Sequence, residues 1–264
     1  MGVDLRQFKA AVVLLFWIPT CAVVGGEQPQ QVNSADPASS SGPAIPCSAL
    51  PEAAASTAET IVAKLVEANA RRAAQLAGYT ATRSYRAENP RWKKSATMEV
   101  KVVFTSPASK VFTVVEERGS GTIRQRVFRR MLEAEKDALT PEMRRRSDIG
   151  PANYRFRFLD EDTLDGQRVY VLELEPLRAD RYSLRGRIWV DACDFAIAKI
   201  RGSPAKSPSF WTRKVEYERV YHKVGEFWLL QREAATSETF IFGKSNVGVE
   251  HSSYEVERIA SPSR

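Results

Sequence analysis

The chain has 264 residues, of which 43% are apolar and 27% charged, and 39 Lys and Arg against 32 Asp and Glu give a net charge of +7. These fractions are typical of a globular protein, and they exclude collagen, wholesale disorder and a polytopic membrane protein. The basic balance suggests nucleic acid or an anionic membrane surface as partners and does not decide between them. Three cysteines and two histidines are too few for a disulfide scaffold and leave little room for metal or acid–base chemistry. The composition therefore favours a binding protein over an enzyme.

The first 26 residues have the pattern of a secretory signal peptide. Arg6 and Lys9 form a short basic region, and residues 10–20 are an apolar run that follows it. The run is too short for a transmembrane helix, and small and polar residues come after it. We therefore expect export to the periplasm with cleavage before Glu27. Cys21 leaves a second interpretation open, a lipid anchor, although the residues before it match that processing site poorly.

Residues 27–51 are rich in Pro, Ser, Ala and Gln and show no periodicity. Such a segment cannot bury enough apolar surface to offset its chain entropy, which predicts a disordered tether in front of one domain at residues 52–260. Cys47 lies in this tether, and Cys193 lies in a predicted turn. An oxidising compartment would permit a bond between them, but their positions favour two unpaired thiols.

A long helix is expected to open the domain. Ser56 and Glu59 match the capping-box pattern in front of an apolar stripe at helical spacing, and Gly78 is a natural stop. We expect this helix to pack against a sheet; an exposed amphipathic helix on a membrane is the alternative. The stripe consists of Ala58, Ile61, Val62, Leu65, Val66, Ala73, Leu76 and Ala77.

After this helix the apolar period changes to two, which predicts strands at 79–87, 98–104 and 111–117. Helical spacing returns between Ile123 and Leu139, and Thr140-Pro141 predicts the start of a second, short helix. The rest of the chain is expected to be nearly all β, so that one large antiparallel sheet or open barrel results. The further strands are predicted at 154–160, 167–175, 183–191, 195–202, 210–221, 226–242 and 247–258.

The sequence contains no recognisable catalytic or metal-binding motif. His222 and His251 stand apart from any HExxH or CxxC pattern, and we interpret both as surface or structural residues. The acidic segment 160–166 lacks oxygen ligands at the positions that a calcium loop needs and is interpreted as a hairpin turn. We therefore predict no catalytic residue, no metal site and no cofactor.

The basic residues do not form a nucleic-acid site either. The arginine run 144–146 lies in the predicted helical insert, whose single aromatic residue is Phe128. Binding of nucleic acid needs basic residues interleaved with exposed aromatics, so we expect no nucleic-acid partner. Attraction to an anionic membrane surface is a better use of the excess charge in an exported protein, although a solvated helix face is the interpretation that we favour for these arginines.

Aromatic residues gather in the C-terminal strands, and the segments 169–172, 188–190 and 227–230 are apolar on both faces. A sheet of that kind must be covered on both sides or must line a cavity. A curved sheet closed by the long helix would leave an apolar hollow for a ligand, whereas ordinary core packing explains the pattern equally well. The residues predicted to line such a hollow are Val102, Phe104, Leu172, Trp189, Phe210, Trp211, Tyr217 and Trp228.

Parts of the sequence resemble the bacterial outer-membrane lipoprotein-sorting proteins, a superfamily of carriers, receptors and sigma-factor regulators. The resemblance is to an uncharacterised branch of that superfamily, and it is carried by segments 153–176, 185–211 and 224–229. The resemblance covers about residues 56–258. It implies an α+β fold, mainly antiparallel β, with a single curved sheet. That sheet forms an unclosed half-barrel, and a long N-terminal helix and a helical insert cover its concave face.

The same resemblance implies a non-catalytic periplasmic binding or carrier protein that accommodates the acyl chains of lipids or lipoproteins. Burial contributes about 0.8 kcal/mol per methylene group, so an apolar hollow alone can hold an acyl chain. A sensor or interaction module on the same fold, which binds a partner protein in the cell envelope, is the alternative function. An enzyme of unknown type is the third possibility. No functional residue of the family is transferred to this sequence.

Overall fold

The computed structural model describes residues 57–180, 182–207, 212–240 and 243–259. The predicted signal peptide and tether lie outside the described residues. The helical elements are α2 (Ala58–Gln75), η3 (Pro90–Trp92), α3 (Gly121–Ile123), the π-helical η4 (Arg124–Phe128), α4 (Arg129–Asp137) and α5 (Pro141–Ser147). The strands are β1 (Leu76–Asn89), β2 (Lys94–Thr105), β3 (Ser109–Gly119), β4 (Tyr154–Leu164), β5 (Gln167–Pro176), β6 (Leu184–Asp191), β7 (Ile197–Pro204), β8 (Thr212–Val224), β9 (Phe227–Thr239) and β10 (Gly243–Arg258).

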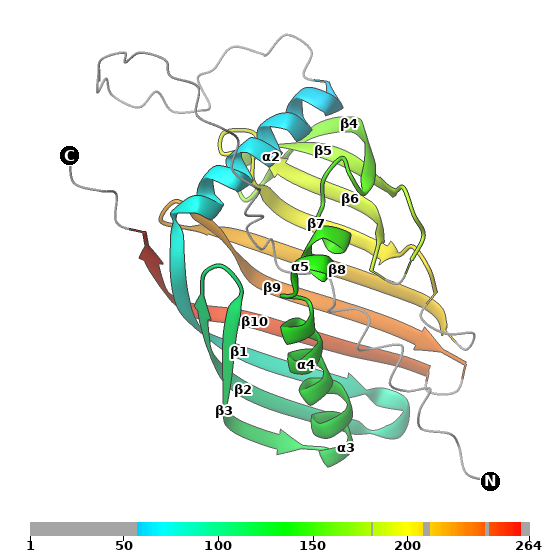
Figure 1. The fold of residues 1–264 in the computed structure, drawn as a ribbon. Coiled ribbons are helices and arrows are strands. Elements are labelled where there is room, and N and C mark those ends of the chain that lie inside the picture. The colour runs from blue at the N-terminus through cyan, green and yellow to red at the C-terminus, as the bar shows by residue number, and fades with distance from the viewer. Residues whose placement is uncertain (1–56, 181, 208–211, 241–242, 260–264) are drawn as a thin grey trace.

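All ten strands belong to one antiparallel sheet in the order β3-β2-β1-β10-β9-β8-β7-β6-β5-β4. Consecutive strands are neighbours in the sheet except β3 and β4, which lie at opposite edges, and β1 pairs with the last strand, β10. β3 and β4 are the two edges of the described sheet, so the barrel does not close. The predicted fold class, an α+β half-barrel with mainly antiparallel strands, is confirmed (Figure 1).

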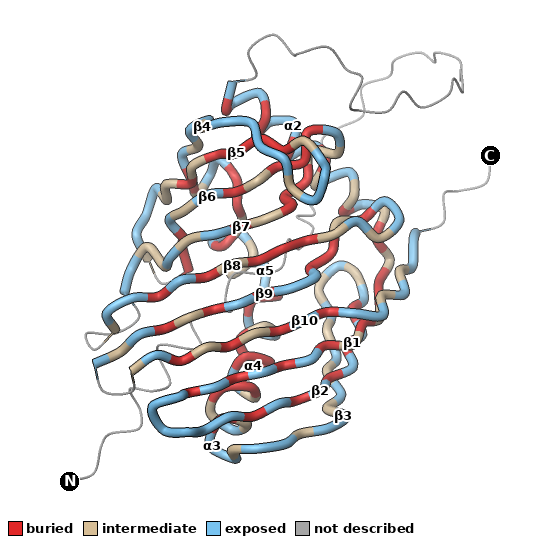
Figure 2. Tube along the Cα trace, turned by 180° about the vertical axis from the view of Figure 1, so that it is seen from behind, coloured by how far each residue is buried: buried red, intermediate tan, exposed pale blue. Residues whose placement is uncertain are grey.

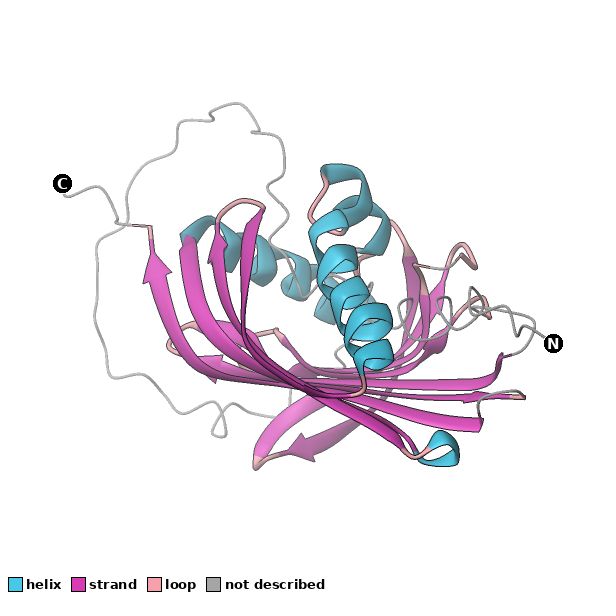
Figure 3. Ribbon diagram, turned by 90° about the horizontal axis from the view of Figure 1, so that it is seen from below, coloured by secondary structure: helices cyan, strands magenta, loops and turns pink. Residues whose placement is uncertain are grey.

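The helices α2, α4 and α5 lie on the same side of the sheet, which curves around them (Figure 3). We call this side the inner face. Strand residues alternate between buried and exposed along β2 and much of β8 and β9, as alternation of side chains between two faces requires (Figure 2). The main core therefore lies between the inner face and the helices.

The helix α2 begins one residue later than the capping-box pattern predicts. The side chain of Thr57 caps it, since Thr57 Oγ1 accepts a hydrogen bond of 3.3 Å from the backbone N–H of Thr60. Ile61, Val62 and Leu65 of the predicted stripe are buried against the sheet, whereas Val66 is exposed. The predicted packed helix is thus present, and its inner stripe is narrower than expected.

Gly78 is not the stop of this helix. The helix ends at Gln75, and β1 begins at the next residue with no loop between them. Gly78 lies inside β1, where a Cβ atom would be only 2.5 Å from the carbonyl oxygen of Phe104 on β2. Glycine is therefore needed here for the close approach of two strands.

The helical insert between β3 and β4 consists of short pieces. Thr140 is the N-cap of α5 and Pro141 its first residue, as the sequence predicts. The preceding segment is interrupted by the π-helical turn η4, a feature often found at functional sites. The insert contributes four apolar side chains to the main core, those of Val127, Phe128, Met131 and Leu132.

The turn between β6 and β7 differs from the prediction in two respects. The carboxylate of Asp191 accepts hydrogen bonds from the backbone N–H groups of Cys193 and Asp194, which delays the start of β7 to Ile197. Cys193 is disulfide-bonded, so the interpretation of this residue as an unpaired thiol is wrong. Its partner cysteine lies outside the described residues.

Among the described residues, no helix combines the length and the apolar character that crossing a membrane requires.

The burial of α2 predicts how truncating one of its side chains changes the free energy of unfolding. Leu65 is 0% exposed, so Leu65→Ala should lower the free energy of unfolding by about 3 kcal/mol, through lost burial and the cavity left behind. Glu67→Ala, on the exposed face of the same helix, should change it by less than about 0.5 kcal/mol. Urea denaturation measures both, and equal effects would contradict the packing described here.

The disulfide of Cys193 predicts a cross-linked peptide. Digestion of the mature protein without reduction should yield the peptide around residue 193 joined to a second cysteine peptide, and reduction should separate them. If cleavage occurs before Glu27, that second peptide must contain Cys47, because Cys21 is then lost. A freely alkylated Cys193 in the oxidised protein would refute the bond.

Candidate functional site

The inner face of the sheet is a largely apolar surface that brings together several of the predicted hollow residues. Val102 on β2 and Leu172 on β5 are both 0% exposed and belong to the same core cluster, although their strands lie in opposite halves of the sheet. Tyr217 on β8 is buried in this cluster, and Trp228 on β9 packs against it while remaining partly exposed. The side chains of α2 and of the insert fill the space above this surface.

The other predicted hollow residues lie elsewhere. Phe104 belongs to a second cluster with Leu76, Tyr79 and Phe227. Trp189 alternates with the buried Ile188 and Val190, so its side chain points to the outer face. There it lies beneath the Lys199 ammonium, 5.2 Å from the ring centre, and it donates a 3.4 Å hydrogen bond to Asp162. Phe210 and Trp211 lie outside the described residues.

The apolar inner face is incompletely covered at the β3 edge. Phe112 and Val114 of β3 pair with Val102 and Val100 of β2, so they share the inner face with these buried residues. Both pack against the main core but remain partly exposed. Their period-two spacing was visible in the sequence, but their position at an edge is a property of the strand order.

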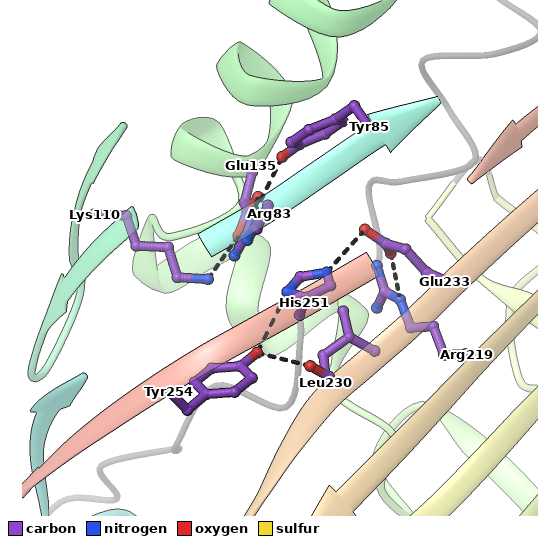
Figure 4. Close-up of polar contacts among 9 residues, drawn as sticks. All are labelled: Arg83, Tyr85, Lys110, Glu135, Arg219, Leu230, Glu233, His251 and Tyr254. Carbon is purple, nitrogen blue, oxygen red and sulfur yellow. Dashed lines mark hydrogen bonds and ion pairs between the residues drawn. The ribbon is translucent and has the colours of Figure 1, made fainter. Parts of the chain in front are cut away.

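A row of buried polar side chains crosses this apolar face. Arg83 on β1 is paired with His251 on β10, and Glu233 on β9 is paired with Arg219 on β8. All four residues are less than 9% exposed. They lie side by side on the inner face of four neighbouring strands (Figure 4). The signal that could have found them is a charged residue at the inward phase of an alternating strand, such as Arg219 between Tyr217 and Tyr221.

The insert contributes a carboxylate to this row. Both Nη atoms of Arg83 donate to Glu135 of α4, at 2.5 and 3.0 Å. Lys110 of β3 donates to the same carboxylate at 2.6 Å. Burial alone would raise the pKa of Glu135, but the cations of Arg83 and Lys110 outweigh it and hold this pKa well below its usual range. The ion cluster ties the insert to two strands of the sheet.

A second cluster follows along the row. Nε of Arg219 donates to Glu233 at 3.0 Å, and Nε2 of His251 lies 3.9 Å from the other carboxylate oxygen of Glu233. Burial, reinforced by the nearby Arg83 cation, lowers the pKa of His251 to about 4 despite the opposing Glu233 carboxylate. His251 is therefore neutral at pH 7, a buried structural residue in keeping with its sequence-based interpretation.

Tyr254 fills the place where β9 and β10 separate. Register pairing of these strands ends at Glu250 and Arg232, and beyond this point the Tyr254 hydroxyl donates a 2.7 Å hydrogen bond to the carbonyl oxygen of Leu230. Its ring lies 5.5 Å from Tyr79 and 5.8 Å from His222. Tyr254 therefore links the two halves of the sheet beside the polar row.

The outer face bears a broad groove of a different kind. This groove has a volume of about 880 Å³ and extends over β1, β2, β3, β9 and β10. Its charged lining includes Arg86, Glu99, Arg118, Arg232 and Glu250. Mixed charges and hydroxyl groups make it unsuitable for an acyl chain, so it is not the predicted apolar hollow.

The buried charged side chains of the inner face pair with one another. Arg83 and Lys110 pair with Glu135, and Arg219 pairs with Glu233. Among the described residues, no group of three His, Cys, Asp or Glu side chains is arranged to hold a metal ion. The inner face therefore combines an apolar surface with buried charged groups near its centre.

Comparison with known proteins gives distant matches among solved structures. No family model matches the chain, and no curated protein sequence matches it. A DUF1329 family protein from Desulfovibrio piger matches with a TM-score of 0.42 at 13% identity, over 77% of this chain and 94% of that one. A putative outer membrane lipoprotein-sorting protein domain from Vibrio parahaemolyticus matches with a TM-score of 0.40 at 15% identity, over 73% and 92%.

The MucA/MucB complex structure from Pseudomonas aeruginosa also matches, with a TM-score of 0.27 at 10% identity over 76% of this chain and 94% of that one. At these identities the likeness concerns the fold alone.

The buried neutral His251 predicts a pH dependence of stability. Its pKa is about 4 in the folded protein against about 6.5 when unfolded. Between these values only the unfolded chain binds the proton, so the free energy of unfolding should fall as the pH drops from about 6.5 to about 4.

The variant His251→Gln should lose much of this fall, whereas His222→Gln, which alters a more exposed ring, should keep most of it. Urea denaturation across this pH range measures the effect, and NMR titration of the two histidine rings measures the pKa directly. A midpoint for His251 near 6.5 would contradict its burial in the ion cluster.

Proposed function

We propose that this protein is a non-catalytic periplasmic binding or carrier protein that accommodates the acyl chains of lipids or lipoproteins on the inner face of its half-barrel. The observation that supports this most is the largely apolar inner face, which runs under the helices and stays partly exposed at Phe112 and Val114. An acyl chain that covers this surface contributes about 0.8 kcal/mol for each buried methylene group.

In this proposal the acyl chain replaces side chains of the helices that cover the sheet. In the structure the apolar side chains of the insert, such as Phe128 and Met131, occupy the space above the sheet. The insert is broken into short pieces by the π-helical turn, and buried ion pairs at Glu135 anchor it. A bound acyl chain takes the place of these side chains, and the insert moves aside.

Export to the periplasm is part of the same proposal. It is supported by the signal-like pattern of residues 1–26 and by the disulfide of Cys193, because disulfides persist in oxidising compartments. The excess of basic residues favours approach to an anionic membrane surface. Whether the protein is soluble or anchored at Cys21 is decided by the mass of the mature N-terminus.

A second candidate function is supported by a different observation. Val111 and Val115 of the edge strand β3 are 56% and 61% exposed. An edge strand offers unpaired backbone groups to a further strand, so a partner protein can add a strand here by β-augmentation. This corresponds to the sensor or interaction module on the same fold.

Two variants of β3 separate these functions. Val114 faces inward and Val111 faces outward on the same strand. Titration with a fluorescent hexadecanoate should show binding to the wild type. Val114→Asp should weaken it about tenfold or more, or ~1.4 kcal/mol, and Val111→Asp should leave it unchanged within about twofold, because the charge lies on the other face.

Absence of binding to the wild type, or equal losses in the two variants, would contradict the carrier function. A protein partner that co-purifies with the wild type and is lost only with Val111→Asp would favour the interaction module. Circular dichroism of each variant controls for folding.

A further inference from the structure

Two cations of the sheet converge on one carboxylate of the insert. Arg83 comes from β1 and Lys110 from β3, whereas Glu135 comes from α4 (Figure 4). Glu135 receives both Nη groups of Arg83 at 2.5 and 3.0 Å and the Lys110 ammonium at 2.6 Å. The geometry is that of a carboxylate bound by a guanidinium fork and a second point charge.

The two cations are buried more deeply than the anion. The side chains of Arg83 and Lys110 are 2% and 5% exposed, and that of Glu135 is 17% exposed. The three groups sum to one positive charge, and Nε of Arg83 is buried without a hydrogen-bond partner among the described residues. The sheet side of the cluster therefore supplies more positive charge and more donors than Glu135 uses.

The surroundings of these cations are apolar and partly open. The Arg83 guanidinium lies 5.6 Å from the ring centre of Phe112, the partly exposed residue at the β3 edge. The ammonium groups of Lys110 and Lys136 lie 5.7 Å from the rings of Phe104 and Phe112, respectively. An apolar surface that leads to buried cations matches a molecule with an acyl tail and an anionic head.

Burial dictates what happens when the insert moves. Removing Glu135 would leave two cations buried without a counter-charge, which is strongly unfavourable. A carboxylate or phosphate in the same position restores the pairing, and the planar fork of arginine suits both groups. The side chain of Glu135 thus stands where a ligand anion would be stabilised most.

We propose that Arg83 and Lys110 form a subsite for the anionic head group of the bound amphiphile, and that Glu135 occupies this subsite in the ligand-free protein. The proposal rests on the acyl-chain function given above and names the ligand class more closely: a single-chain or lipid phosphate or carboxylate. Glu135 competes with the head group, so that a ligand without an anion does not displace the insert efficiently.

The test compares three probes by calorimetric titration: decyl phosphate, 1-decanol with the same chain, and inorganic phosphate without a chain. Wild-type protein should bind decyl phosphate about tenfold more tightly than decanol, which corresponds to one unit of log affinity. Inorganic phosphate should bind far more weakly than decyl phosphate. Equal affinity for the two phosphates would overturn the head-group assignment in favour of a site for free phosphate.

Matched variants locate the effect. Glu135→Gln keeps the shape of the side chain and removes the competing charge, so it should tighten decyl phosphate binding about tenfold, whereas decanol, which gains only from the weaker anchoring of the insert, should tighten less. Glu133→Gln, at an exposed position of the same helix, should change neither. Lys110→Met should weaken decyl phosphate binding and spare decanol, and it keeps the test decisive if Glu135→Gln does not fold.

The two levels of the proposal fail in different ways. If neither amphiphile binds the wild type or Glu135→Gln, the acyl-chain function itself is wrong. If decyl phosphate and decanol bind alike in the wild type and in every variant, the acyl-chain function stands and the anionic subsite is wrong.

Discussion

The constraint that governs this structure is the need to cover one face of an open sheet. The inner face bears large side chains with no exposure at all, such as Leu172, Ile188 and Ile200, and an apolar face left in water costs about 25 cal/mol for each square ångström. The half-barrel does not close on itself. Its curvature and the helices α2 and α4 must therefore provide the cover, and the rest of the fold follows from how they do so.

The two covering elements are attached by different forces. The helix α2 packs by an apolar stripe and continues into β1 without a loop, so it cannot leave without disturbing the first strand. The insert is connected at both ends by turns, and an ion cluster in addition to its apolar residues ties it to the sheet. Ion pairs in the interior contribute little net stability but fix geometry and can be exchanged for other ion pairs. In the proposed function the insert is therefore the part of the cover that a ligand displaces.

The buried charges of the inner face differ in where their partners come from. Arg219 and Glu233 form a pair on neighbouring strands that is complete within the sheet. Among the described residues, the carboxylate that pairs with Arg83 and Lys110 is Glu135 of the insert. Packing alone would be served better by apolar residues at these positions. Under the proposed function, Arg83 and Lys110 would pair with the anionic group of a bound ligand.

Local patterns in the sequence determined the elements of this protein and their order. The apolar stripe of Ile61, Val62 and Leu65 predicted α2, and alternation predicted the strands. Asp165-Gly166 predicted a tight turn, where both residues have positive φ. These features depend on neighbours within a few residues, so they are encoded locally. The face of Val102 also followed from its phase within its strand.

Only the tertiary structure decided which face each aromatic residue serves and which charges meet. Trp189 and Trp228 have similar apolar surroundings in the sequence, yet one lies on the outer face beside Lys199 and the other packs against the core. Glu135 meets Arg83 across 52 positions of the chain, through a helix whose docking no short pattern contains. Register, bulges and docking are long-range contacts, and their outcome is set by the packing of the whole sheet rather than by any single segment.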